Sequence, residues 1–358
     1  MPSSFDAFEA RVRVLLAEFP TMPATVLAER IGWDGSPSWF RKRVALLRPE
    51  YAPKDPVDRL EHLPGDQAQC DLWFPPAPIP LGFGQVGSPP VLVIVASFSR
   101  FVTAAMLPTR TTPDLLAGMW LLLSQQLGAV PKRLLWDNES GIGRRGRLSD
   151  GVAGFCGALA TRLVQCKPFD PESKGVVERM NGYLETSFLP GRSFTSPADF
   201  NAQLDQWLPR ANQRRVRVLR ACPMDLVDTD RAAMLALPPL APPVGHRTRI
   251  RLGRDYVVRV AGSDYSVDPI MIGRMVEVTA DLTTVTITAD GRVVGVHARS
   301  WVSANTVIDP AHVASAARLR AAFQQPTHTD DPLRRDLADY DRAFGVTLPD
   351  HNDDGQVA

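Results

Sequence analysis

The first 50 residues repeat apolar positions with the period of an α-helix. Four apolar side chains recur three or four positions apart and predict a helix over 5–18: Phe5, Phe8, Val12 and Leu15. A second, shorter helix is expected over 24–31. The glycine-rich segment 32–35 predicts a tight turn. Ser36 is a good N-cap, and Pro37 suits the first position of a third helix that ends near residue 47.

The third helix keeps its apolar residues on one side and its basic residues on the other. Arg41 and Lys42 fall on the outer side, while Phe40 and Val44 face inward. Helix, glycine turn and basic helix together are typical of a helix-turn-helix. A generic helical hairpin gives the same pattern. We therefore expect residues 1–48 to be a helix-turn-helix DNA-binding domain, followed by a proline-containing linker over 49–65.

From residue 66 to 235 the pattern alternates between strands and helices. Strands are expected over 68–74, 91–97, 101–107, 132–136 and 163–167, and helices over 112–127, 149–161, around Glu178 and over 197–213. The run 91–97 is apolar throughout, as in a strand that is covered on both faces. This order predicts a multidomain α/β protein whose middle part is a mixed sheet with helices on its faces. The Pro/Gly-rich stretch 75–90 is an insertion of unknown role.

The C-terminal third changes to a period of two. A proline-rich linker is expected over 236–247, and several short alternating strands over 248–303 predict a small β-barrel. Hairpin turns are expected at 262–264 and 289–291. The last part, 304–358, has helical potential at first, then becomes acidic and is expected to be partly disordered.

Composition narrows the class of protein. The chain has 358 residues, 44% hydrophobic and 22% charged, which is typical of two to four soluble globular domains. It has no run of 18 apolar residues and no basic-apolar leader, so we expect a bacterial cytoplasmic, nucleoid-associated protein with no membrane contact. The four cysteines and six histidines are scattered, which argues against disulfides and a zinc site.

The net charge of +1 hides an uneven distribution. Residues 328–358 contain eight aspartates against three arginines, so the preceding chain is clearly basic. Its basic residues form local runs, including 41–43, 144–147, 210–220 and 247–259. Spread along a long chain, such runs favour extended contact with a polyanion, although charged runs are often only solvated surface.

Three acidic residues occupy unusual positions in the middle domain. Asp71 lies inside an otherwise apolar strand, Asp137 ends another strand, and Glu178 lies on a helix at the edge of an apolar stripe. If the two strands are neighbours, the three carboxylates can converge, and their mutual repulsion makes sense mainly around divalent cations. Two Mg²⁺ or Mn²⁺ ions in such a site can drive phosphoryl transfer.

A simpler reading exists for each of these acids. Lys174 and Glu178 are four residues apart and can form an ordinary helical ion pair. Each acid can also be a cap, a turn residue or a surface charge. Asp66, Glu139 and Glu185 are nearby acids that could be chosen in their place.

Several motifs resemble one known family. The segments 65–73 (GDQAQCDLW), 136–138 (WDN) and 174–179 (KGVVER) are similar to those of IstA-type transposases of the IstA/IstB insertion-sequence family, within the DDE transposase and retroviral-integrase superfamily. The 40 residues between Asp137 and Glu178 fit that superfamily. Segments 212–214, 222–226 and 264–274 add to the resemblance, which covers about residues 20–305. Family members often have a longer N-terminal region with more than one helix-turn-helix.

The resemblance implies an RNase H-like catalytic core and a DNA transposase that cuts 3′ ends and joins them to target DNA. It implies that Asp71, Asp137 and Glu178 hold two Mg²⁺ (or Mn²⁺) ions. It further implies self-association into at least a dimer on DNA and a helper ATPase of the IstB type. The candidate DNA contacts are Ser38, Arg41, Lys42, Arg43, Arg144, Arg145, Lys174, Arg214 and Arg215. Alternatives are a DNA-binding regulator with an inactive core and a plain RNase H-like nuclease.

Overall fold

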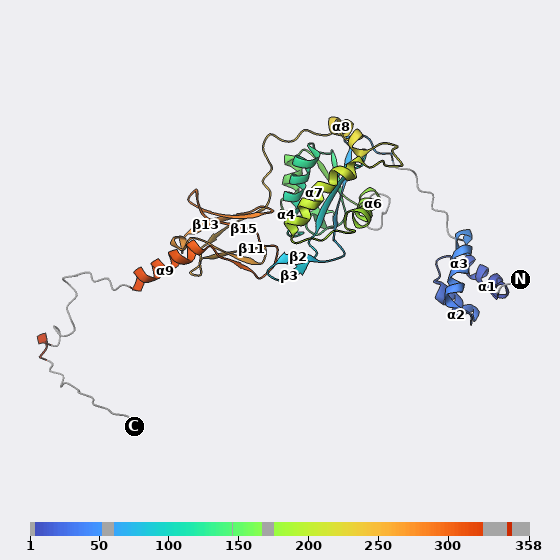
Figure 1. The fold of residues 1–358 in the computed structure, drawn as a ribbon, viewed down its shortest axis with the longest axis horizontal. Coiled ribbons are helices and arrows are strands. Elements are labelled where there is room, and N and C mark those ends of the chain that lie inside the picture. The colour runs from blue at the N-terminus through green and yellow to red at the C-terminus, as the bar shows by residue number, and fades with distance from the viewer. Residues whose placement is uncertain (1–3, 52–60, 145, 167–174, 325–341, 346–358) are drawn as a thin grey trace, which may run out of the picture. The chain divides into compact units, whose positions relative to one another are not determined.

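The structure is a computed structural model that describes residues 4–51, 61–144, 146–166, 175–324 and 342–345 (Figure 1). The chain divides into two compact units, residues 1–61 and 62–358. No described helix is both long and apolar enough to cross a membrane.

The N-terminal unit is the expected bundle of three helices. They are α1 (Asp6–Glu18), α2 (Ala24–Ile31) and α3 (Pro37–Tyr51). Their apolar faces meet in a core that includes Val12, Leu27 and Phe40. Gly32 ends α2 with a φ of 72°, a left-handed conformation that favours glycine. The Oγ of Ser36 accepts a hydrogen bond from the amide of Trp39 at 3.4 Å, so it caps α3 as expected.

Helix α3 continues to Tyr51, past the boundary predicted at residue 48. The guanidinium of Arg13 on α1 donates to Glu50 at 2.5 Å and to the Tyr51 hydroxyl at 3.2 Å. These contacts hold an extra turn against α1 despite Pro49. The first three residues of the predicted linker therefore belong to the bundle, and most of its remainder lies outside the described residues.

The centre of the second unit is a mixed sheet of five strands in the order β5-β4-β1-β6-β9. The strands are β1 (Gln67–Trp73), β4 (Val91–Ala96), β5 (Val102–Met106), β6 (Arg133–Trp136) and β9 (Arg162–Gln165). Strands β1, β4 and β5 are antiparallel, whereas β6 and β9 run parallel to β1. The predicted mixed sheet is thus confirmed, and β1 and β6 are neighbours.

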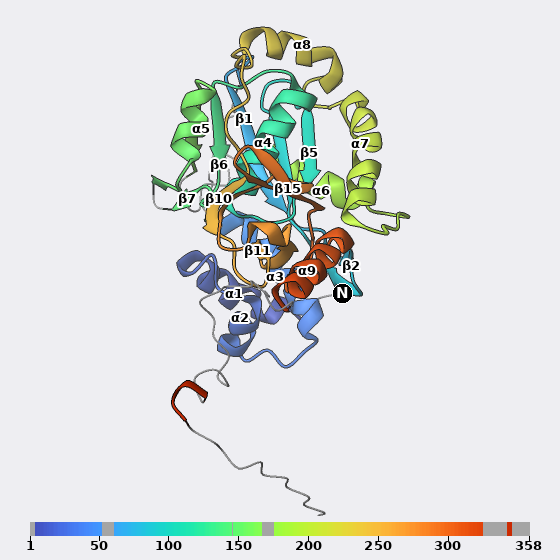
Figure 2. The ribbon, with the colours of Figure 1, turned by 90° about the vertical axis from the view of Figure 1, so that its left-hand side faces the viewer.

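Helices cover both faces of this sheet (Figure 2). One face packs against α4 (Thr112–Leu121), its π-helical continuation η1 (Leu122–Leu127) and α5 (Val152–Ala158). The other packs against α6 (Gly175–Tyr183), its continuation η2 (Leu184–Phe188) and α7 (Pro197–Gln213). Alternation along β1 assigns its residues to these layers, because Ala68 and Cys70 belong to the first core and Trp73 to the second.

Two small hairpins and one helix were not predicted. The insertion 75–90 folds into β2 (Ile79–Gly82) and β3 (Gln85–Gly87), and the loop after Asp137 into β7 (Gly143–Arg144) and β8 (Arg147–Leu148). Helix α8 (Pro223–Ala233) closes one end of the core. Its buried Asp230 accepts hydrogen bonds from the amides of Gly65 at 2.5 Å and Ser99 at 3.1 Å.

The C-terminal strands form two sheets around one core. One sheet has the order β10-β13-β14-β15 and the other β11-β12-β16. The strands are β10 (His246–Arg251), β11 (Val257–Val260), β12 (Ser263–Ser266), β13 (Met275–Ala280), β14 (Thr284–Ala289), β15 (Arg292–Ala298) and β16 (Thr306–Val307).

Two predictions for the C-terminal region, the closed barrel and the extent of the linker before it, need correction. Pairing among the described strands does not close a barrel, because the β11–β12 hairpin pairs with β16 and not with the four-stranded sheet. The predicted linker 236–247 also ends early, since β10 begins at His246. A short 3₁₀ segment, η3 (Pro269–Met271), and helix α9 (Pro310–Gln324) complete this region. Helix α9 confirms the helical potential after residue 304, and most of the acidic tail lies outside the described residues.

Candidate active site

Asp71 and Asp137 lie at the same level on neighbouring strands. Strands β1 and β6 are parallel, with Gln67 paired to Arg133 and Gln69 to Leu135. Continuing this register by two residues sets Asp71 beside Asp137, just past the end of β6. Because side chains alternate along a strand, both aspartates belong to the face opposite Cys70 and Trp136, which is the face covered by α6 and α7.

Three residues of β1 hold the α6–η2 helix through a row of hydrogen bonds, which we call the β1–α6 ladder. The buried Gln69 accepts from the amides of Val176 and Val177 through its Oε1, both at 3.0 Å. The Nδ2 of Asn181 donates to Asp71 Oδ2 at 2.8 Å. Trp73 Nε1 donates to Glu185 Oε1 at 3.1 Å.

The ladder is regular because its successive residues are spaced at nearly equal distances along the strand and along the helix. Its strand residues are two apart and its helix residues, Val177, Asn181 and Glu185, are four apart. Two strand residues rise about 6.6 Å and four helical residues about 6 Å. The helix therefore runs alongside β1 in a fixed register, which aligns α6 with Asp71.

Glu178 follows the ladder residue Val177 and is exposed to solvent. One residue corresponds to about 100° of helical rotation, so Glu178 and Arg179 lie on different flanks of α6. Arg179 lines a cavity together with Val95 of β4. Glu178 therefore lies on the other flank, toward β6 and Asp137.

The three acids provide oxygen donors of the kind that Mg²⁺ and Mn²⁺ prefer. The described residues nevertheless include no group of three acidic, histidine or cysteine side chains close enough together to hold a metal ion. Asp71 and Asp137 lie side by side on neighbouring strands. Glu178 is exposed and points into solvent from α6. The chemistry of the donor set fits a divalent cation.

The neighbouring acids also have structural partners. Asp66 forms a salt bridge with Arg133, and Glu185 is a ladder residue. Glu139 accepts from the hydroxyl of Ser140 at 3.0 Å. Asp137 receives the amide of Asn138 at 2.8 Å, which orients its carboxylate.

The candidate DNA contacts of α3 differ in their surroundings. Ser38, Arg41 and Lys42 are exposed. Arg43 is instead half-buried, with its guanidinium 5.3 Å from the ring centre of Phe5 and 3.8 Å from Glu9. Arg43 thus packs on the bundle, and its predicted contact with DNA stays a prediction. Ser38, Arg41 and Lys42 lie on the exposed side of α3.

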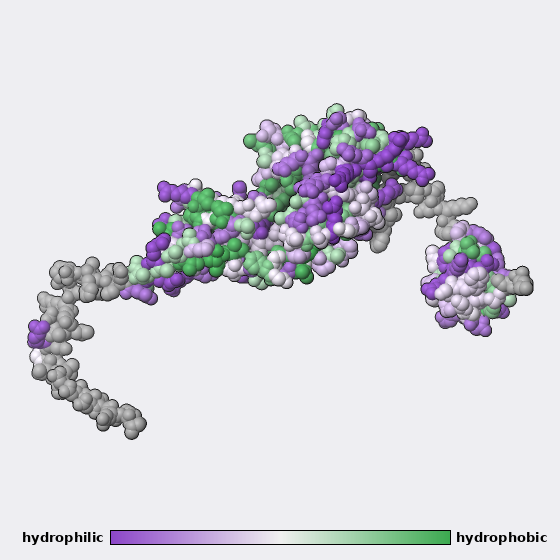
Figure 3. All heavy atoms as spheres, viewed as in Figure 1, coloured by the Kyte–Doolittle hydropathy of each residue, from purple (hydrophilic) through white to green (hydrophobic). Residues whose placement is uncertain are grey.

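The remaining candidates belong to the second unit. Arg144 is exposed on the β7–β8 hairpin, whereas Arg145 and Lys174 lie outside the described residues. Arg215 is exposed just after α7, and Arg214 is half-buried, 5.0 Å from the ring centre of Tyr183. Hydrophilic residues gather around the connection between α7 and α8 (Figure 3).

Sequence reasoning missed four residues beside the candidate site. They are Gln69, Asn181, Arg100 and Arg179. A glutamine in an otherwise apolar part of β1 was a usable signal for Gln69. Asn181, Arg100 and Arg179 could not be recognised without the packing of α6. Polar residues on a helix or in a turn are common, and most of them are simply exposed.

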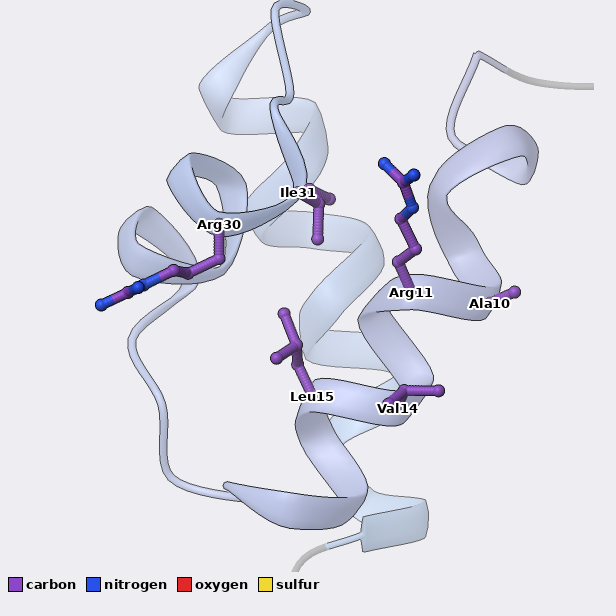
Figure 4. Close-up of a pocket in the computed structure, with 6 residues that line it drawn as sticks. All are labelled: Ala10, Arg11, Val14, Leu15, Arg30 and Ile31. Carbon is purple, nitrogen blue, oxygen red and sulfur yellow. The ribbon is translucent and has the colours of Figure 1, made fainter.

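The N-terminal unit has a groove of about 410 Å³ between α1 and α2 (Figure 4). Apolar side chains of Val14, Leu15 and Ile31 line it, and the guanidinium of Arg30 extends away from it (Figure 4). Its lining residues have neither a carboxylate nor a nucleophile. The groove is therefore no candidate for catalysis.

Comparison with known proteins adds an independent observation. A protein of Geobacillus stearothermophilus, provisionally described as a transposase for insertion sequence element IS5376, is 26% identical over 192 residues, 51% of this chain and 46% of that protein. The transposase for insertion sequence element IS21 of Pseudomonas aeruginosa is 29% identical over 119 residues, 33% of this chain and 30% of that protein. The homologues are insertion-sequence transposases.

Two further matches concern parts of the chain. Residues 237–309, which contain the two C-terminal sheets, match the family described as Mu transposase, C-terminal domain. The crystal structure of the catalytic core domain of BIV integrase is similar at a TM-score of 0.35 and 18% identity, over 46% of this chain and 93% of that one. The matches span between 30% and 64% of the length of these transposases.

Proposed function

We propose that the protein is an IstA-type DNA transposase that cuts the 3′ ends of an insertion sequence and joins them to target DNA. The proposal rests on the positions of Asp71 and Asp137. They lie side by side on neighbouring strands, on the sheet face that α6 covers. The relationship to insertion-sequence transposases supplies the substrate class, DNA. The strand order β5-β4-β1-β6-β9 supports an RNase H-like core.

Asp71, Asp137 and Glu178 would hold two Mg²⁺ or Mn²⁺ ions. When bound, such ions would supply activation of an attacking oxygen and stabilisation of the leaving oxygen of a phosphodiester. The contribution of the chain is to place the carboxylates. The β1–α6 ladder fixes the helix register, and Asn181 holds one oxygen of Asp71. Water and then a 3′ hydroxyl would be the nucleophiles, so no covalent protein–DNA intermediate is expected.

The other parts of the chain would bind DNA and partners. Ser38, Arg41 and Lys42 on α3 would contact element ends as a helix-turn-helix, with most contacts to phosphates. Arg144, Arg145, Lys174, Arg214 and Arg215 are proposed phosphate contacts around the core. Synapsis of two ends requires at least a dimer, and an IstB-type ATPase is the proposed helper. The enzyme would act on DNA in the bacterial cytoplasm.

The decisive experiment is a strand-transfer assay with candidate element ends and Mg²⁺. Asp137→Asn should leave binding to ends nearly intact and abolish both cleavage and joining. Glu139→Gln is the matched control, because it removes a nearby charge outside the proposed triad, and it should retain activity. Joining by Asp137→Asn would refute the assignment of the triad.

The same assay separates the alternatives. A regulator with an inactive core would bind ends without cutting them under any metal condition. A plain nuclease would cut DNA but never join ends. The transposase is favoured because three candidate ligands are present and the homologues are transposases.

A further inference from the structure

A cavity of about 260 Å³ lies beside α6, on the flank away from Glu178. Three arginines from separate parts of the chain share its lining: Arg100 from the β4–β5 turn, Arg179 from α6 and Arg214 from the end of α7. The rest of the lining is mostly apolar and includes Val95 and Met180. No acidic side chain is among the described residues that line it.

Arg100 is the innermost of the three arginines. Its backbone φ is 61°, a left-handed conformation that is unfavourable for a residue with a side chain. Its Nη1 is buried and has no hydrogen-bond partner among the described residues. Burial, followed by the positive charge of Arg179, lowers the pKa of Arg100 to about 10. Arg100 is therefore a half-buried cation whose buried Nη1 has no partner among the described residues.

The other two arginines complete a cationic wall. Arg214 lies against the ring of Tyr183 and donates to the carbonyl of Ala211, and burial lowers its pKa. Arg179 is exposed and lies at the mouth of the cavity. Arg100 and Arg179 repel each other, and three guanidinium groups around one cavity are costly without an anion. The planar guanidinium favours phosphate oxygens.

We propose that this cavity binds one phosphodiester of the DNA backbone, held jointly by Arg100, Arg179 and Arg214. The identification of the anion as DNA rests on the proposed function, whereas the phosphate chemistry rests on the cavity alone. The cavity and the candidate carboxylates lie on opposite flanks of α6. A DNA strand bound in the cavity would therefore cross α6 on its way to Asp71 and Asp137, which would fix the scissile phosphate at a set distance along the strand.

The test compares inorganic phosphate with DNA on the full chain in EDTA. Phosphate binding is measured as the increase in melting temperature relative to chloride at equal ionic strength. Binding of a labelled 20-base-pair duplex is followed by anisotropy at several salt concentrations. The variants are Arg179→Gln and Arg179→Gln/Arg214→Gln, with Arg318→Gln on the exposed face of α9 as the matched loss of one charge.

Arg179→Gln should weaken duplex binding about 10-fold and abolish the phosphate-specific rise in melting temperature. The double variant should reduce the slope of log affinity against log salt by about 0.9, the contribution of one phosphate. Arg179→Lys should keep most of that slope but lose affinity, because lysine cannot bind in a bidentate manner. Arg318→Gln should change neither the phosphate response nor duplex affinity by more than about 2-fold.

Equal phosphate and duplex binding by the wild type and by Arg179→Gln would overturn the cavity assignment. Loss of phosphate binding without loss of duplex binding would overturn its assignment to DNA. Because metal is absent throughout, these outcomes are independent of cleavage. An inactive triad would refute the proposed function and leave the phosphate site standing.

Discussion

Arg299 and Asp114 form a bidentate ion pair between the C-terminal sheets and the first turn of α4. Nη1 lies 2.7 Å from Oδ1 and Nη2 lies 2.8 Å from Oδ2. The side chains are only 2% and 1% exposed. Nη1 also donates to the carbonyl of Asp281 at 2.6 Å. The pair thus joins the sheet core to the region that matches the Mu transposase C-terminal domain.

Removing one partner of this pair should strongly destabilise the protein. Arg299→Met leaves the Asp114 carboxylate buried without its cation, which typically costs about 3–5 kcal/mol. The denaturant midpoint of the full chain measures the loss. The double variant Asp114→Leu/Arg299→Met removes both charges and should recover most of it. A loss below about 1 kcal/mol for the single variant would mean that the pair is not buried in solution.

The ladder residue Gln69 should control both stability and joining. Gln69→Leu leaves the amides of Val176 and Val177 without an acceptor. The Val177 bond is buried, and leaving its amide unpaired costs about 1–3 kcal/mol. Joining of pre-cut ends should fall further than DNA binding, because α6 loses its register. Gln69→Glu retains an acceptor near the helix N-terminus and should lose less stability than Gln69→Leu. Equal effects of the two variants would contradict the ladder.

Arg41 and Arg43 should behave differently although both are basic residues of α3. Arg41 is exposed, so Arg41→Ala should weaken binding to ends and reduce the salt slope by about 0.9. Arg43 lies over Phe5 and beside Glu9, so Arg43→Ala should lower the melting temperature of the N-terminal unit with little change in that slope. An unchanged slope for Arg41→Ala would count against the DNA-binding assignment of α3.

His62 should make stability depend on pH. Burial lowers its pKa first, and the charge of Arg100 lowers it further. The folded state therefore binds this proton less readily than the unfolded state, so stability should fall as pH drops through about 6.5, the ordinary histidine pKa, and below. The ring Nδ1 lies 3.1 Å from Gln67 Nε2, a contact that needs neutral histidine. His62→Gln should flatten the denaturant midpoint between pH 7 and 5, and an identical slope would refute this role.

Hydrophobic periodicity predicted the elements of the core because each has a clear period and a buried face. Helix α2 begins and ends at the predicted residues, and α7 does so as well. Helix α8 was missed because its stability comes from contacts distant in sequence, such as Asp230 with Gly65. Strand β10 was missed because exposed charged residues dominate it, as Arg249 and Arg251 illustrate.

The candidate site was predictable as a set of residues but not as an arrangement. An aspartate within an apolar strand indicated Asp71, and the end of a strand indicated Asp137. Their common level depends on the register of β1 with β6, which no local pattern encodes. The partnership of Asp71 with Asn181 depends on the packing of α6, and so does the clustering of three arginines on its other flank.

The matched spacing of ladder residues along β1 and α6 also limits which insertions and deletions the two segments can accept. Deleting one residue between Val177 and Asn181 would rotate the rest of α6 by about 100° and break two rungs together. An insertion within 69–73 would move Trp73 to the opposite face of the sheet. Insertions and deletions should therefore be rejected both within 69–73 and within 177–185, which gives engineers two segments of this protein whose length must be kept.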